Sequence, residues 1–420
     1  MTEEYHRSMV FSIHRFIMRL LLRVEIAGCG LFQDKFIFDF VNSDSVRKSY
    51  FDNDNALQAY KIKPGIYTQV LMALTGLNAT GKTTTLELLS AITQIVMQGK
   101  SLNDPSIRRV FFKLLPLMKE KNLEWNVFFF YKHKFYILHS VITAENILNE
   151  AVEDSGFKFK FEELKKCKEK VTRKNLGEVA SYTIDLNRSE VADNPYLKDD
   201  VSIISSFKGF QGSVFPLGQS TNLNLPAWIG VPAEEVVHVF DPNIENLSIS
   251  RDKEGKTTSR LSFKNHRKFT YGGSPMGLLD LLSSGTIKGW TVLPGIIRVL
   301  KLGGYVFIDE IENHFNKKII EWFFSLFTDV RTNPNGACLI FSTHYPELLD
   351  SFKRKDNIYI TRRDKENYCE CVRYSDFVRR NELLKSKVIL ENVINGTAPR
   401  YQDLENGRKW ISSIVNKEGV

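Results

Sequence analysis

Cysteine is scarce in this sequence, with five residues among 420, and the five are scattered along the chain. No Cys-x-x-Cys pair occurs, so the sequence lacks the paired thiols of a zinc hook. Cys369 and Cys371 stand one residue apart without a second pair, which makes a poor zinc site. An odd and scattered set is typical of reduced thiols, and we expect five free cysteines.

Long apolar runs are missing too. No stretch reaches the roughly 18 apolar residues of a membrane helix. The apolar N-terminal segment opens with Glu3 and Glu4 and is interrupted by His14, Arg15 and Arg19, whereas a signal peptide has a basic start and an unbroken apolar core. Sustained heptads, internal repeats and low-complexity runs are also absent. We therefore expect a cytoplasmic globular protein without a long coiled-coil arm.

Positive charge is in mild excess. Lys and Arg number 57 against 49 Asp and Glu, a net charge of +8, and 43% of the residues are hydrophobic. The last 70 residues carry 15 Lys and Arg against 10 Asp and Glu, so they supply +5 of this charge. Such a balance permits a nucleic acid or another acidic partner without requiring one.

The strongest motif is a glycine loop. "GLNATGKTT" fits the pattern G-x-x-x-x-G-K-[ST], between a strand-like run at 66–75 and a helix-like run at 83–96. The glycines let successive N–H groups face one anion, Lys82 can reach phosphate oxygens, and the Thr83 hydroxyl can bind Mg²⁺. We predict a nucleotide-phosphate site, whose candidate contacts are Gly76, Asn78, Ala79, Thr80, Gly81, Lys82, Thr83 and Thr84. The alternative is a glycine turn that caps a helix.

Two further signals follow in order along the chain. "YVFIDE" is an apolar strand that ends in paired acids, from which Asp309 would hold Mg²⁺ and Glu310 would polarise the attacking water. "CLIFSTH" is a second such strand, which ends at His344, a candidate to contact the γ-phosphate. The alternatives are a solvated acidic loop and a surface histidine.

"LLSSGTIKG" raises a different possibility. If it begins a helix, Ser283, Ser284 and Gly285 offer hydrogen-bond donors for a second anion. Because one chain needs one phosphate loop, the simplest geometry is a head-to-tail dimer. The serine turn of one subunit would then close over ATP held by the other.

These motifs, in this order, resemble the ATP-binding cassette (ABC) ATPases, in the branch with RecF, SMC and overcoming-lysogenisation-defect proteins. The resemblance implies a Walker A loop at 76–83, a signature motif at 282–286 and Walker B acids at Asp309 and Glu310. It also implies a D-loop at 312–316 and a switch histidine at His344, with ATP and Mg²⁺ as ligands. Phe315-Asn316 departs from the Leu-His that this branch often has after the Walker B acids. Gln211 and Gln219 are two candidates for the Q-loop glutamine, although the expected location just after the 124–142 hairpin has none.

Within this branch, the compact size, the signature "LLSSGT" and the tail "ENVINGTAPRYQDL" resemble ATPases of bacterial anti-phage and abortive-infection systems, which accompany RloB- or AbiL-type partners. That resemblance implies a sensor or scaffold subunit that controls a separate nuclease or toxin. No Toprim or H-N-H nuclease pattern follows His344. Two other classes stay open: a DNA-binding repair or chromosome-maintenance ATPase, favoured by Arg362, Arg363, Arg379 and Arg380, and the nucleotide-binding subunit of a transporter.

The expected fold is an α/β P-loop NTPase of the ABC-head type, with an N-terminal antiparallel β subdomain. We expect the first half of the core at 1–144, an insertion or lid at 145–275, the second half of the core with a helical signature lobe at 276–350, and a basic extension at 351–420. Hairpins are predicted over 124–142 and around 253–256, and a charged helix over 161–174.

Overall fold

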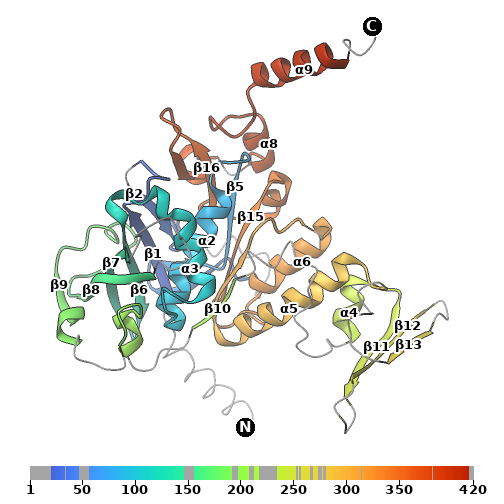
Figure 1. Ribbon diagram of the computed structural model, residues 1–420, viewed down its shortest axis with the longest axis horizontal. Coiled ribbons are helices and arrows are strands. Elements are labelled where there is room, and N and C mark those ends of the chain that lie inside the picture. Colours follow the sequence, from blue (N-terminus) through green and yellow to red (C-terminus); the bar gives the residue numbers. More distant parts are fainter. Residues whose placement is uncertain are drawn as a thin grey trace.

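The computed structural model describes most of the chain. The described residues are 20–33, 35–46, 56–145, 156–191, 197–207, 212–216, 234–251, 254, 257–264, 268–272, 277, 281–313, 315–380 and 382–415. They form two six-stranded sheets that share a core, a small three-stranded sheet at one end, and a C-terminal helix that stands off the body (Figure 1). The predicted mixed α/β fold with an antiparallel N-terminal sheet is confirmed.

The first sheet is antiparallel, in the order β2-β1-β6-β7-β8-β9. Its residues alternate between the core and the outside, as in β2, which has one buried and one open face. The predicted hairpin over 124–142 is β6 and β7, which turn at Lys132 and His133 with positive φ. The strands are β1 (Leu20–Ala27), β2 (Lys35–Asp39), β6 (Asn122–Tyr131), β7 (Lys134–Glu145), β8 (Gly156–Cys167) and β9 (Tyr182–Asn187).

The second sheet positions the candidate site. Its order is β10-β14-β15-β5-β16-β17, and all neighbours are parallel except the hairpin β16–β17. The central strands are apolar on both faces, as parallel strands covered on both sides are. They are β5 (Leu71–Gly76), β10 (Ser213–Pro216), β14 (Gly304–Ile308), β15 (Cys338–Thr343), β16 (Ile358–Arg363) and β17 (Cys369–Arg373).

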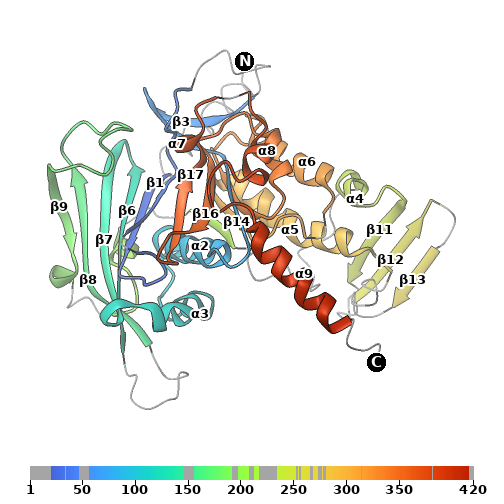
Figure 2. The same cartoon turned by 90° about the horizontal axis from the view of Figure 1, so that it is seen from above.

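Helices cover both faces of this sheet. Met72 and Leu74 of β5 face a core shared with α2 (Lys82–Gln98), α3 (Pro105–Leu114) and the antiparallel sheet. Leu71 and Ala73, which alternate with them, face a second core with α5 (Ser284–Leu302) and α6 (Lys317–Phe327). The parallel sheet is therefore the middle layer of the molecule, as seen from above in Figure 2.

The remaining elements are smaller. β11 (Ile244–Arg251), β12 (Thr257–Phe263) and β13 (Lys268–Gly272) form the three-stranded sheet, beside α4 (Glu234–Phe240) and α5. β3 (Ala59–Lys63) pairs with β4 (Ile66–Gln69), and α7 (Tyr374–Phe377), α8 (Lys385–Leu390) and α9 (Tyr401–Val415) close the chain. Short 3-10 helices lie at Leu115–Leu117, Lys119–Lys121, Arg188–Val191, Ile203–Ser206 and Pro346–Ser351. Among the described residues, no helix is both long enough and apolar enough to cross a bilayer.

Two local predictions are wrong. The charged run at 161–174 lies partly in β8, because its alternating pattern buries Leu164 and Glu162 on the covered face of the sheet. The buried Glu162 carboxylate accepts hydrogen bonds from Arg188 and Ser202, which makes a charged strand position tolerable. The run at 66–75 is two strands, β4 and β5, which belong to different sheets.

The region predicted as an insertion contributes to three sheets. β8 and β9 extend the antiparallel sheet, β10 pairs with β14 at the edge of the parallel sheet, and β11 to β13 form the small sheet. The predicted hairpin around 253–256 corresponds to β11 and β12, although most of its turn lies outside the described residues. The sheet of β11 to β13 and α4 is the part of this region that stands apart from both large sheets (Figure 1).

Candidate nucleotide-binding site

The glycine loop lies between β5 and α2, at the carboxyl edge of the parallel sheet. Gly76 has φ 146° and Gly81 has φ 92°, a region that favours glycine. A Cβ on Gly76 would lie 2.1 Å from the Thr361 carbonyl oxygen, and one on Gly81 would lie 2.7 Å from Cys369 Sγ. Both glycines are therefore required by close packing as well as by backbone conformation.

Lys82 lies inside the loop. Its side chain is buried, and Nζ donates to the carbonyl oxygens of Gly76 at 2.9 Å and Leu77 at 2.8 Å. Burial lowers the pKa of this ammonium, and the carboxylates of Asp309 and Glu310 act in the opposite direction. The loop thus holds a desolvated cation at the N-terminus of a helix, where an anion is favoured.

Thr83 and Asp309 meet across the sheet edge. Thr83 Oγ1 donates to Asp309 Oδ2 at 2.9 Å, and Ser342 Oγ donates to Asp309 Oδ1. Burial raises the pKa of the Asp309 carboxyl, although both hydroxyl donors stabilise the charged form. A hydroxyl and a carboxylate side by side are the hard oxygen ligands that Mg²⁺ takes beside a nucleotide phosphate, so these residues fit the ion.

Glu310 follows β14 in a left-handed conformation, with φ 48°. Its N–H donates to Ser342 Oγ at 2.8 Å, and its Oε2 accepts from Asn313 Nδ2 at 2.6 Å. Its Oε1 lies 3.5 Å from His344 Nε2. Residues that follow the neighbouring strands β14 and β15 therefore converge on one carboxylate, which is left half-exposed.

The residues predicted as a D-loop support this arrangement. Glu312 Oε1 accepts the N–H of His344 at 2.6 Å, while Glu312 Oε2 is buried without a partner among the described residues. Asn316 caps α6 through its side chain, which accepts from the Ile319 N–H. Asn316 therefore has a structural role here.

The hairpin β16–β17 packs against the loop, a contact that no sequence motif indicated. Arg363 donates to the Ala79 carbonyl from Nε at 3.1 Å and Nη2 at 2.7 Å. Cys369 Sγ donates to the Thr80 carbonyl at 2.7 Å, and Thr361 Oγ1 lies 2.7 Å from Thr80 Oγ1. Burial raises the pKa of the Cys369 thiol to about 11, so it stays a neutral donor.

These contacts orient the loop backbone. In a planar trans peptide, the carbonyl and the N–H point in opposite directions. Arg363 and Cys369 hold the carbonyls of Ala79 and Thr80 toward the hairpin, so the N–H groups of Thr80 and Gly81 point away from it. Two successive N–H groups therefore point to the side of the loop where an anion would bind. Ala79 has a left-handed φ of 59° in this arrangement.

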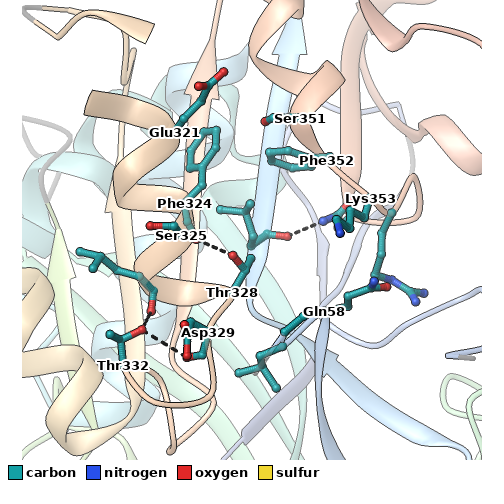
Figure 3. Close-up of a pocket in the computed structure, with 16 residues that line it drawn as sticks. Gln58, Glu321, Phe324, Ser325, Thr328, Asp329, Thr332, Ser351, Phe352 and Lys353 are labelled. Carbon is teal, nitrogen blue, oxygen red and sulfur yellow. Dashed lines mark hydrogen bonds between the residues drawn. The ribbon is translucent and has the colours of Figure 1, made fainter. Parts of the chain in front are cut away.

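A cavity of about 450 Å³ adjoins the loop. Its lining includes Gly76, Asn78, His344 and the segment from Thr397 to Pro399. Another cavity, of about 380 Å³, lies at the opposite edge of the sheet, where Phe324, Thr328 and Phe352 surround the first residue of β5 (Figure 3). It contains none of the predicted site residues.

The other residues that the sequence predicts for the site do not contact the glycine loop or the paired acids in the described part of the chain. Ser283 caps α5, since its Oγ accepts the Thr286 N–H at 3.1 Å, and Ser283 and Ser284 are exposed. In the described part of the chain, no hydrogen bond or ion pair joins Ser283, Ser284 or Gly285 to the glycine loop. Thr84 is half-buried on α2. Gln211 and Gln219 lie outside the described residues.

One protein-family model matches a stretch that contains part of this site. A family model described as an AAA domain, putative AbiEii toxin, Type IV TA system, matches residues 237–350. That stretch includes the serine turn, the paired acids and His344, but not the glycine loop. No curated protein matches the chain.

Two solved structures are similar to the chain. One is the SmcHead bound to the C-winged helix domain of ScpA, at 11% identity and a TM-score of 0.40, over 84% of this chain and 96% of that one. The other is an Smc head domain with a coiled coil and joint derived from Pyrococcus yayanosii, at 8% identity and a TM-score of 0.41. The match covers 85% of this chain and 97% of that one.

The stretch matched by the family model contributes residues to the candidate site. Asp309 of this stretch accepts a hydrogen bond from Thr83, on the helix that follows the glycine loop, and His344 lies beside Glu310. The chain therefore has a mixed α/β fold, and residues 237–350 of it are similar to an AAA domain.

Proposed function

We propose that the chain binds ATP with Mg²⁺ and hydrolyses it to ADP and phosphate. The observation that carries this proposal is the hydrogen bond from Thr83 to Asp309, with Glu310 and His344 beside it at the same sheet edge. The loop amides and Lys82 would hold the phosphates, and Thr83 and Asp309 would hold Mg²⁺. Gly76, Asn78 and Thr84 would complete the contacts of the loop.

Each remaining residue then has one task. Bound ATP and Mg²⁺ supply an electrophilic phosphorus and charge neutralisation. Glu310 Oε1 accepts a proton from water, and Asn313 fixes the carboxylate through Oε2. His344 Nε2, 3.5 Å from Oε1, orients the same water, and Glu312 holds the backbone of His344 in place.

The serine turn serves a second subunit in this proposal. Ser283, Ser284 and Gly285 are outside the site of their own chain and begin a 19-residue helix. A head-to-tail dimer would bring them to the ATP held by the partner, where their donors and the helix dipole meet the γ-phosphate. The exposure of Ser283 and Ser284 supports this assignment.

We further propose that ATP turnover controls a separate nuclease or toxin in bacterial anti-phage defence. Support comes from the family description, which names a toxin and a toxin–antitoxin system. A DNA-binding repair ATPase is the alternative. Two of the arginines that favour it have local partners: Arg362 pairs with Glu370 at 2.8 Å, and Arg363 holds the glycine loop. Arg379 and Arg380 are exposed.

Affinity purification of the Glu310→Gln variant from its host tests this assignment. The variant keeps the phosphate loop, so it accumulates the ATP-bound state. A stoichiometric partner with nuclease or toxin activity supports the defence function. DNA retained in a salt-sensitive manner, with no protein partner, contradicts it and supports the repair function.

A further inference from the structure

Three segments that are far apart in the sequence carry nine basic residues and one acid. The segments are 61–63 in β3, 132–134 at the turn between β6 and β7, and 166–174, which begins in β8. Their net charge of +8 is as large as that of the whole chain. The basic residues are Lys61, Lys63, Lys132, Lys134, Lys166, Lys168, Lys170, Arg173 and Lys174, and the acid is Glu169.

One small apolar cluster brings the three segments together. Phe135 and Val171 are buried in this cluster, and Ile62 packs against it. In the sequence, Ile62 lies between Lys61 and Lys63, and the other two apolar residues each follow a lysine. Because the apolar side chains are buried, the cations lie around them at the protein surface. We call these nine cations the lysine patch.

Direct contacts join the segments to one another. Lys63 Nζ donates to the His133 carbonyl oxygen at 3.0 Å. The Lys134 ammonium lies beside that of Lys166, on the neighbouring strand β8, and this contact lowers the pKa of Lys134, while Asp185 acts in the opposite direction. Like charges held side by side on neighbouring strands are unfavourable for folding, so the arrangement suits an anionic partner.

Few acids offset the patch. Glu169, the acid within the three segments, accepts the N–H groups of Ala180 at 2.6 Å and Ser181 at 3.1 Å. Glu178 and Asp185, on the loop and strand that follow, are exposed. Even when these two acids are included, the patch has nine cations against three carboxylates, so its surface stays strongly positive.

The lysine patch is far from the candidate nucleotide site. β6 (Asn122–Tyr131) pairs along its length with β1. The end of β1 that pairs with Glu124 leads to Leu31, whose carbonyl accepts the N–H of Cys369 beside the glycine loop. The patch lies at the other end of β6, roughly 30 Å away along the strand. Its cations are therefore out of reach of phosphates held by that loop.

The composition of the patch favours the phosphate backbone of a nucleic acid. Its charges come from eight lysines and one arginine, whereas the cores of protein interfaces are depleted in lysine and rich in aromatic residues. None of the large apolar side chains that are exposed in the described chain falls in the three segments. The patch therefore lacks an apolar anchor for a lipid surface.

The aromatic rings beside the patch favour a double strand over a single strand. Single strands are bound by stacking their bases on open aromatic faces. Tyr131 and Phe135, which flank the lysines of the turn, are buried. Tyr182 of β9 is exposed, but Lys165 lies over its ring at 4.8 Å and occupies one face. Lysines contact phosphates as point charges, and such contacts carry no sequence information.

We propose that the lysine patch binds the phosphate backbone of a nucleic-acid duplex independently of base sequence. The binding needs no ATP, so it does not rest on the proposed ATPase function. Each lysine that meets a phosphate releases a counterion, and affinity therefore falls steeply with added salt.

Fluorescence anisotropy of a labelled DNA duplex, titrated with the full chain without nucleotide, tests the proposal. The wild type should bind with a micromolar dissociation constant near physiological salt. A triple charge reversal at exposed lysines of the patch should raise this constant at least about tenfold. Its substitutions are Lys132→Glu, Lys134→Glu and Lys170→Glu.

A matched control makes the same change of charge elsewhere. Lys301→Glu, Lys318→Glu and Lys387→Glu, combined, reverse three exposed lysines on α5, α6 and α8. Because salt screens charges beyond about 8 Å under physiological conditions, the control should keep its affinity within about twofold. Circular dichroism checks that both variants are folded. Equal weakening by the control, or a wild type that does not bind the duplex, overturns the proposal.

The salt dependence counts the phosphate contacts. Lys132→Gln, Lys134→Gln and Lys170→Gln, combined, should flatten the slope of log affinity against log salt by about 2 to 3, since each contact with a duplex contributes about 0.9. An unchanged slope would mean that these lysines do not meet phosphates, which contradicts the proposal.

Competitors separate the sources of phosphate. Displacement of the labelled DNA by an unlabelled DNA or RNA duplex supports the proposal, and the tighter competitor identifies the preferred duplex. Tighter binding of single-stranded DNA, or binding of phosphatidylserine vesicles at the patch in place of the duplex, overturns it. Loss of ATP turnover in a chain that still binds the duplex would count against the proposed function alone.

Discussion

His344 Nε2 lies 3.5 Å from Glu310 Oε1, although the two residues follow different strands. β14 and β15 are parallel neighbours, so their carboxyl ends meet at one edge of the sheet. Ser342, at the end of β15, contacts both the N–H of Glu310 and the carboxylate of Asp309. This serine therefore joins the proposed metal ligand to the proposed general base.

The first prediction concerns Glu310. Glu310→Gln keeps the side-chain shape and the Asn313 contact but removes the proton acceptor. Phosphate release should fall at least about a hundredfold, because general base catalysis is lost. ATP affinity should stay near that of the wild type. The matched control is Glu347→Gln, at an exposed residue of the Pro346–Ser351 turn, which should release phosphate at the normal rate.

The second prediction concerns Lys82. Lys82→Ala should weaken ATP binding by about ten- to a hundredfold, because a charge-assisted contact to phosphate is lost. The fold should survive, since the burial that lowers the pKa of Lys82 makes this cation costly to bury. Titration with a fluorescent ATP analogue measures the affinity. An unchanged affinity would mean that the glycine loop does not bind phosphate.

The third prediction concerns Arg363, which orients the loop from outside. Arg363→Ala frees the Ala79 carbonyl, so the KM for ATP should rise by about tenfold while kcat changes little. Arg363→Lys should recover only part of the affinity, because lysine lacks the planar pair of donors. Arg331→Ala is the control, at an arginine that pairs with Asp329 on the surface. Equal KM values for Arg363→Ala, Arg363→Lys and Arg331→Ala would show that Arg363 does not position the loop.

The fourth prediction follows from the raised pKa of Asp309. The folded protein binds a proton at Asp309 more readily than the unfolded chain does, so the charged form destabilises the fold above the raised pKa. Asp309→Asn should therefore increase the free energy of unfolding near pH 7.5 by about 1 kcal/mol and abolish turnover. The gain should shrink as the pH falls. Denaturant unfolding at several pH values measures it, and a destabilised variant near neutral pH would refute the argument.

The residues proposed for the centre of the site could be named from the sequence because local patterns mark them. Glycines with positive φ, a lysine at a helix start and acids at the end of an apolar strand can each be recognised from a few neighbouring residues. The hairpin over 124–142 was predictable for the same reason, since both strands and the turn are contiguous. Thr83 and Asp309 are 226 residues apart, and only the order of parallel strands brings them together.

The contacts made by the C-terminal part of the chain could not be predicted in this way. Arg363 and Cys369 belong to no motif, and charge alone indicates only a basic surface at Arg363. Their role depends on β16 lying beside β5, a pairing between strands far apart in the sequence. The helix prediction at 161–174 was wrong because the many charged residues of this run obscure its alternation of buried and exposed positions. Glu162 is buried in β8, where it forms an ion pair with Arg188.

The most direct test of the central claim mixes two inactive variants. Lys82→Ala removes the phosphate contact, and Ser284→Arg blocks the serine turn while leaving ATP binding by its own chain intact. In a head-to-tail dimer, a mixed pair has one site with an intact loop and an intact turn. Phosphate release should therefore return to about one quarter of the wild-type rate in an equimolar mixture. Normal turnover by Ser284→Arg alone, or no recovery in the mixture, would contradict a site composed of two subunits.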